Sequence, residues 1–203
     1  MDLPVAATTF ALIFPVELPD KTFIASLVLA TRYRPALVWV GVSLAFLVQC
    51  VVAVAAGGLL SLLPSAVVAA AAGVLFLIGA VVLWRGAADA DADADAEEEF
   101  RDRATAEVHG ARVVATSFGV LFLAEWGDLS QLLTAGLAAR YEDPVSVFAG
   151  SWLALVTVAA LAVLLGRTLL RHVRLSTIRW VGASVCLVLA LLAAYDVVRS
   201  LTS

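Results

Sequence analysis

Apolar residues fill six long runs of the chain, and short polar stretches separate them. A helix needs about 20 apolar residues to cross the roughly 30 Å hydrocarbon core of a bilayer, and each run comes close to that length or exceeds it. None of the runs alternates like a barrel strand, whereas helices satisfy their own backbone hydrogen bonds in lipid. The pattern predicts an all-α polytopic membrane protein with six transmembrane helices, at residues 5–30, 36–60, 65–83, 113–138, 145–165 and 178–198.

The composition supports this class. Hydrophobic residues make up 63% of the 203 residues, and the mean hydropathy is +1.01, which excludes an ordinary soluble domain. Cys50 and Cys186 both fall inside predicted spans, so neither a disulfide framework nor a zinc site is indicated. The N-terminus "MDLPVAATTF" lacks the basic residues of a signal peptide. We expect a protein of the lipid bilayer with no nucleic-acid partner.

The arginines predict the orientation of the spans, because cytoplasmic loops carry an excess of basic residues. Six spans place ten arginines on one side of the membrane and two, Arg140 and Arg199, on the other. Both termini are therefore expected outside the cytoplasm. Trp84 and Trp180 are expected as interfacial anchors on the cytoplasmic side. A bacterial inner membrane is the expected location.

The chain contains an internal repeat. Shifting the sequence by 108 residues aligns "VELPDKTFIASLVLATRY" with "LAEWGDLSQLLTAGLAARY", and an offset of 109 then matches glycines further along both halves. Those glycine pairs are Gly41/Gly150, Gly57/Gly166 and Gly73/Gly182. Three spans is an odd number, so the second repeat must lie inverted to the first, as in many secondary transporters. The predicted organisation is a three-helix repeat at residues 1–85, an acidic cytoplasmic linker at 86–111, and a second repeat at 112–203.

Charged side chains interrupt two of the apolar runs. Glu17, Asp20 and Lys21 lie in the first run, and Glu125 and Asp128 lie at matching positions in the fourth. One charge at the bilayer centre costs about 2.5 to 3.5 kcal/mol on insertion scales, so such residues usually have a function. Glu17 and Asp20, three residues apart, share one helix face. Helix breaks are predicted beside them, at Pro15 and Pro19 in the first repeat and at Gly127 in the second.

Four carboxylates in one cavity would need protons or a cation to balance their charge. Oxygen ligands without histidine or thiolate favour hard divalent ions such as Ca²⁺, Mn²⁺ or Mg²⁺. Thr22, Ser130 and Gln131 add neutral oxygens on the same segments, and Lys21 is predicted either to balance the charge or to take part in gating or proton coupling. Gln49 is interpreted as a helix–helix hydrogen-bonding residue rather than a ligand.

The paired motifs resemble the doubled E-x-G-D-K-[ST] signature of a membrane cation/proton antiporter family that includes the Golgi and chloroplast manganese/calcium transporters and bacterial manganese exporters. Pro19 and Leu129 depart from that signature. The resemblance covers nearly the whole chain. It implies a non-enzymatic antiporter that carries Mn²⁺ or Ca²⁺ against protons, with no permanent cofactor. By resemblance, the cation ligands are Glu17, Asp20, Glu125 and Asp128.

Other interpretations of the sequence remain open. An amino-acid or other small organic-solute exporter could use the same scaffold, with Lys21 and the acids binding a zwitterion, but the site is nearly all negative. A non-transporting assembly factor would need no coupled acids. In the linker, Asp89, Asp91 and Asp93 alternate as in a calcium loop, yet Ala94 and Phe100 occupy positions where that loop needs glycine and glutamate. The linker is therefore interpreted as a solvated tether.

Overall fold

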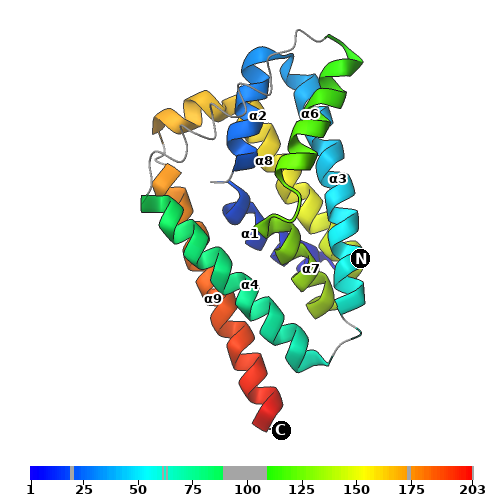
Figure 1. Cartoon of the computed structure of the whole chain (residues 1–203), viewed down its shortest axis with the longest axis vertical. Helices are drawn as coiled ribbons and strands as arrows, with labels where there is room; N and C mark the ends of the chain where they lie inside the picture. Colours follow the sequence, from blue (N-terminus) through cyan, green and yellow to red (C-terminus); the bar gives the residue numbers. More distant parts are fainter. Residues whose placement is uncertain (19–20, 61, 63, 89–108, 173–174, 203) are drawn as a thin grey trace.

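The structure of the chain is a computed structural model, which describes residues 1–18, 21–60, 62, 64–88, 109–172 and 175–202. Within these ranges the chain folds into helices without any strand (Figure 1). The helices are α1 (Leu3–Glu17), α2 (Lys21–Arg32), α3 (Pro35–Leu60), α4 (Ser65–Ala88), α6 (Ala111–Ala124), α7 (Leu129–Tyr141), α8 (Pro144–His172) and α9 (Leu175–Thr202). The predicted all-α class is confirmed for this part of the chain, while most of the acidic linker lies outside it.

Two of these helices are long and apolar enough to cross a membrane, Pro35–Leu60 and Pro144–Leu164. Helices α6 and α7 together form a third candidate, a broken span whose two parts meet at 74°. The first predicted span corresponds to two shorter apolar helices, α1 and α2. Helices α4 and α9 have 24 and 28 residues, or about 36 and 42 Å at 1.5 Å per residue. The predicted apolar runs are thus helical in the described residues, with α4 and α8 continuing to Ala88 and His172. By length and composition, however, these residues contain two or three candidate spans rather than the predicted six.

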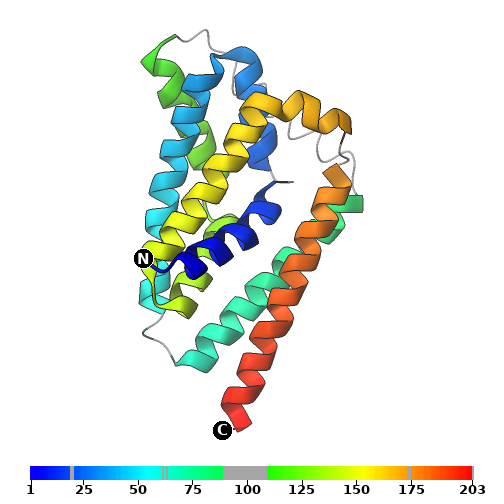
Figure 2. The same cartoon turned by 180° about the vertical axis from the view of Figure 1, so that it is seen from behind.

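The two halves of the chain, α1–α4 and α6–α9, are interleaved. The most extensive packing pairs α4 with α9, α1 with α8, and α3 with α6. Figure 2 shows α8 running between α1 and α3, while α4 and α9 lie side by side as an elongated pair. Each of these interfaces joins one half to the other, so the hydrophobic core belongs to both halves together.

Matched glycines make matched contacts across this interface. A Cβ added at Gly41 in α3 would lie 2.9 Å from the Cβ of Ser117 and would also collide with the Val114 carbonyl of α6. A Cβ added at Gly150 in α8 would lie 2.8 Å from the Cβ of Thr9 and would collide with a carbonyl of α1. Gly41 and Gly150 are a repeat pair, and so are Ser117 and Thr9. The two crossings therefore use the same positions in both halves.

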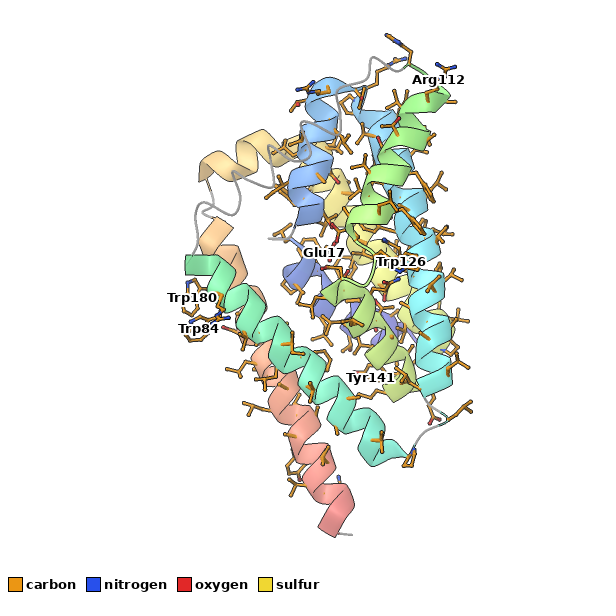
Figure 3. The ribbon with its side chains drawn as sticks, in the orientation of Figure 1. Glu17, Trp84, Arg112, Trp126, Tyr141 and Trp180 are labelled. Atoms are coloured by element: carbon orange, nitrogen blue, oxygen red, sulfur yellow. The ribbon has the colours of Figure 1, made fainter. Side chains whose placement is uncertain are left out.

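The helix ends sort onto two sides of the molecule. The upper side in Figures 1 and 2 holds the end of α2, the start of α3 and the start of α6. The lower side holds the end of α3, the end of α7, the start of α8 and the C-terminus, and the N-terminus also lies below the centre. Trp84 and Trp180 are exposed and form an edge-on pair with ring centroids 4.4 Å apart, near the end of α4 and the start of α9 (Figure 3).

Helix α8 begins with a tight polar cap on the lower side. Asp143 precedes Pro144, and its Oδ1 accepts a hydrogen bond from the Ser146 amide at 3.1 Å, while the Ser146 hydroxyl donates to Oδ2 at 2.6 Å. Proline at the first helical position and a carboxylate just before it are both favourable at a helix start. The hydrogen bonds from Ser146 hold the pKa of Asp143 below its usual range. The Asp2 amide donates to the Ser146 hydroxyl at 2.6 Å, which ties the N-terminus to this loop.

Candidate cation site

The second half carries the helix break that the sequence predicts at Gly127. Helix α6 ends at Ala124, α7 starts at Leu129, and Gly127 between them adopts a φ of +76°. Only glycine reaches this left-handed region without strain. The Gly127 amide donates to Oε1 of Gln131 at 2.7 Å, so this predicted ligand oxygen is engaged by the loop backbone. Asp128 stands directly before α7 in an extended conformation.

The break in the first half differs from the prediction at Pro15. Helix α1 continues through Pro15 and ends two residues later, at Glu17. Proline cannot donate to the carbonyl four residues earlier, that of Ala11, so one bond of the ladder is missing. The helix nevertheless continues past it, and the Leu18 amide donates to the Phe14 carbonyl at 3.1 Å. The predictions for Pro19 and Asp20 fall on residues outside those that the structure describes.

Glu17 is the centre of the candidate site. Its side chain is fully buried, and in Figure 3 it lies between Arg112 on the upper side and Tyr141 on the lower side. The Thr22 hydroxyl donates to Oε1 of Glu17 at 2.7 Å. Ser130 and Asp128, both from the second half, lie close enough to Glu17 to form a hydrogen bond and a charge interaction with it, respectively. The structure thus brings predicted residues of both halves around one carboxylate.

Two carboxylate oxygens at this site are buried without a hydrogen-bond partner among the described residues. They are Oε2 of Glu17 and Oδ2 of Asp128. Burying a charged oxygen without a partner is costly, so a proton or a cation is needed to compensate. This is the arrangement expected where a bound species completes the site.

Of the two remaining predicted ligands, Glu125 and Asp20, the structure describes only Glu125. Glu125 is 3% exposed and stands at the end of α6, where its carbonyl accepts a hydrogen bond from the Asp128 amide at 3.2 Å. Neither Asp20 nor the Lys21 side chain belongs to what the structure describes. Among the described side chains, His, Cys, Asp and Glu do not gather in a group of three or more that could hold a metal. The full four-carboxylate set therefore remains a prediction.

Gln49 of α3 supports the broken span from the side. It is 4% exposed, and its Nε2 donates to the Phe122 carbonyl at 3.3 Å. That carbonyl lies in the last turn of α6, where carbonyls lose their helical partners because the helix stops. The interpretation of Gln49 as a helix–helix hydrogen-bonding residue is confirmed. Its role at the break was not predicted, because sequence spacing does not show which carbonyl a glutamine reaches.

The described part of the site offers hard oxygen donors. Glu17, Thr22 and Ser130, from α1, α2 and α7, carry carboxylate and hydroxyl oxygens, and oxygens of this kind suit Mn²⁺, Ca²⁺ or Mg²⁺. Helix α1 ends at the site, whereas α2 and α7 begin there, so backbone groups without helical hydrogen-bond partners lie nearby. The same oxygens can hold protons instead of a cation.

Comparisons with known proteins agree with this chemistry. The profile of the family described as "Divalent cation/proton antiporter GDT1" matches residues 5–91 and 113–200. The GDT1-like protein sll0615 of Synechocystis sp. is 32% identical over 175 residues, which cover 82% of this chain and 84% of that protein. A protein of Vibrio cholerae serotype O1 with the provisional name of manganese exporter is 32% identical over 197 residues, 95% of this chain and 90% of its own length.

A plant relative is longer than this chain. Protein PAM71, chloroplastic, of Arabidopsis thaliana is 30% identical over 212 residues, which cover 95% of this chain but 57% of that protein. The rice GDT1-like protein 1, chloroplastic, is likewise covered over 62% of its length. The chain therefore spans about 60% of these chloroplast relatives. No solved structure matches the chain.

Proposed function

Because this chain belongs to the divalent cation/proton antiporter GDT1 family, we propose that it exchanges Mn²⁺ or Ca²⁺ for protons across a membrane. The family is one of transporters, not of enzymes. The name of the Vibrio cholerae relative favours manganese export as the direction and cargo. The cation and the protons are substrates in this proposal, and the chain needs no permanent cofactor.

The observation that carries the proposal is the buried carboxylate of Glu17, which has Thr22 on one side and the second-half residues Ser130 and Asp128 nearby. We propose that Glu17, Asp20, Glu125 and Asp128 form a cage near the middle of the bilayer that holds either one divalent cation or protons. Thr22 and Ser130 orient the carboxylates, and Lys21 tunes their charge. Since one set of oxygens serves both substrates, binding of one displaces the other.

The mechanism proposed for this exchange is alternating access between two inverted three-helix repeats, 1–85 and 112–203, joined by the 86–111 linker. The matched crossings at Gly41 and Gly150 support it, because they relate α3 and α6 to α8 and α1 by the repeat offset. In such folds one repeat moves against the other around a fixed central site. Exchange then requires that the cage open to one side at a time.

Ion flux into proteoliposomes tests this function directly. The purified chain is reconstituted, a pH gradient is imposed, and Mn²⁺, Ca²⁺ and Mg²⁺ are offered in turn. We expect uptake of at least one of these ions that depends on the gradient and is accompanied by proton movement in the opposite direction. Proton-linked movement of a zwitterionic amino acid without any divalent flux would favour an organic-solute exporter instead.

The sidedness of the chain can be tested with two exposed positions at opposite ends of the helices. Leu62 follows α3 on the lower side and is 80% exposed, and Arg112 lies at the start of α6 on the upper side (Figure 3). Because the helix ends on the upper side carry Arg32, Arg34 and Arg112, and cytoplasmic loops are rich in basic residues, we propose that this side faces the cytoplasm. In a background without Cys50 and Cys186, an impermeant thiol reagent should label a Leu62→Cys variant in intact cells and an Arg112→Cys variant only after lysis. The reverse pattern would contradict this orientation.

The acidic linker should be dispensable for the transport step, since its charges match no coordination pattern. Replacing residues 89–99 with a Gly/Ser segment of equal length should preserve most of the Mn²⁺ flux per molecule inserted. Quantifying inserted protein on the same vesicles supplies the control. Complete loss of flux at normal insertion would reveal a functional site in the linker.

A further inference from the structure

Two buried hydroxyls occupy matching positions in the two halves, Thr9 in α1 and Ser117 in α6. Both side chains are 0% exposed, and neither hydroxyl has a hydrogen-bond partner among the described residues. By contrast, the hydroxyls of two other buried helical residues, Thr134 and Ser151, donate to the carbonyl four residues earlier at 2.8 and 2.7 Å. A buried hydroxyl without a partner destabilises a fold. The presence of two such hydroxyls would be explained if each formed a hydrogen bond in another conformation of the protein.

The pairing sets Thr9 and Ser117 apart from other hydroxyls. The hydroxyls of Ser26 and Ser43 are also without a partner in the described part of the chain. The repeat counterpart of Ser26, however, is Thr134, whose hydroxyl donates a hydrogen bond. The counterpart of Ser43 is Trp152, whose side chain carries no hydroxyl. Thr9 and Ser117 are thus the matched pair that shares both burial and an unsatisfied hydroxyl.

Each of the two hydroxyls lies at a crossing that is closed in this structure. Thr9 packs against Gly150, and Ser117 packs against Gly41, so closely that an added Cβ at either glycine would come within 2.9 Å of the neighbouring side chain. The helices are therefore in direct contact at both places. Separation of either pair, α1 from α8 or α6 from α3, would expose the hydroxyl on the surface that opens.

The two crossings lie on opposite sides of the carboxylate site. Thr9 precedes Glu17 by eight residues, and Ser117 precedes Glu125 by eight, which is about 12 Å along a helix. Helix α6 starts on the upper side and descends to the break, whereas α1 starts below the centre and ends at Glu17 (Figures 1 and 3). Gly41, which faces Ser117, lies six residues after the start of α3 on the upper side, and Gly150, which faces Thr9, lies six residues after the start of α8 on the lower side. The two crossings are thus displaced toward opposite sides of the molecule.

From this placement we infer that Thr9 and Ser117 are transient contact sites for the hydrated divalent cation, one on each access route to the cage. The inference rests on the proposed antiport. When α1 separates from α8 at Gly150, the Thr9 hydroxyl bonds to water of the cation on the extracytoplasmic route. When α3 separates from α6 at Gly41, Ser117 does the same on the cytoplasmic route. Because each hydroxyl meets its partner only when its crossing is open, it has no hydrogen-bond partner among the described residues when the crossing is closed.

Removal of each hydroxyl at nearly constant volume tests the inference. Thr9→Val and Ser117→Ala should leave the thermal midpoint unchanged or raised, because no hydrogen bond is lost in the closed state. Mn²⁺ flux should nevertheless fall about tenfold. Loss of a residue that hydrogen-bonds to a metal's ligands typically lowers metal affinity or activity by about 10- to 100-fold, and we expect the lower end of that range. Ser151→Ala, in the helix that contacts Thr9, is the control and should lower the midpoint while preserving flux. Unchanged flux in both test variants would overturn the inference.

Thiol accessibility tests the same inference without relying on flux. In a background without Cys50 and Cys186, Thr9→Cys should react with an impermeant thiol reagent only from the extracytoplasmic side, and Ser117→Cys only from the cytoplasmic side. Saturating Mn²⁺ should change the two rates in opposite directions. Reaction of neither variant, or of both from one side, would overturn the two-route assignment. If the unmodified protein shows no divalent flux, the proposed function fails instead, whatever the labelling pattern.

Discussion

Replacing Glu17 by glutamine is expected to reduce proton-driven Mn²⁺ flux by at least about 100-fold, since even partners that only orient metal ligands are worth about 10- to 100-fold in affinity or activity. The amide keeps the shape of the side chain, and its oxygen can still accept the hydrogen bond from Thr22. What it removes is the buried charge that the cation must neutralise. The fold should persist, because an amide is less costly to bury than a carboxylate. Size-exclusion behaviour and thermal midpoint check that point.

Proton release gives the same variant a second readout. Adding Mn²⁺ to detergent-solubilised protein in weak buffer should release protons, because the metal binds the ionised carboxylates. The Glu17→Gln variant should release fewer or none. Glu142→Gln changes an exposed acid in the loop between α7 and α8 and should behave like the unmodified protein. Metal binding without proton release in the unmodified protein would contradict the antiport mechanism.

Adding one methyl group at Gly150 or Gly41 is expected to have a large effect on stability. Alanine at either position places its Cβ against a backbone carbonyl of the facing helix, which cannot rotate away as a side chain can. Overpacking costs typically about 1 to 3 kcal/mol, and a rigid contact belongs at the upper end. We therefore expect Gly150→Ala and Gly41→Ala each to lower the thermal midpoint clearly and to reduce the yield of folded protein.

Gly119 supplies the matched control for this prediction. It lies inside α6, yet an added Cβ there would meet no atom within 4 Å. Since alanine is favoured over glycine inside a helix by about 1 kcal/mol, Gly119→Ala should leave the midpoint unchanged or raise it. A fall equal to that of the other two variants would mean that the crossings are not the source of the effect.

The long apolar helices, the break at Gly127 and the burial of two carboxylates were predictable from the sequence. The length and hydrophobicity of two apolar runs were enough to predict α3 and α8. An apolar run of about 20 residues or more rarely forms anything other than a membrane helix. Gly127 was predictable as a break because glycine tolerates a backbone conformation that other residues avoid. The repeat placed Glu17 and Glu125 at matching positions in two apolar runs, and both side chains are buried.

Other features depend on contacts that no local pattern encodes. Pro15 was predicted to break the helix, but α1 continues through it to Glu17, because the loss of one hydrogen bond can be outweighed by the packing of the rest of the helix. The hydrogen bond from Gln49 to Phe122 joins residues 73 positions apart. Likewise, the glycine matches predicted close contacts in both halves without indicating that the partners of Gly41 and Gly150 lie in the opposite half. Tertiary packing decides such questions, and spacing along the chain does not.

The interleaving of the halves also determines when the molecule can assemble. During synthesis the first three apolar runs enter the membrane before α8, α6 and α9 exist, so α1, α3 and α4 lack their main packing partners at that stage. Contacts between residues so distant in sequence form late, because chain closure must precede them. At that stage Glu17 lies in the bilayer without its neighbours Ser130 and Asp128, which have not yet been synthesised. Burying that carboxylate without its partners is costly, so the first half alone is expected to be less stable in the bilayer than the complete molecule.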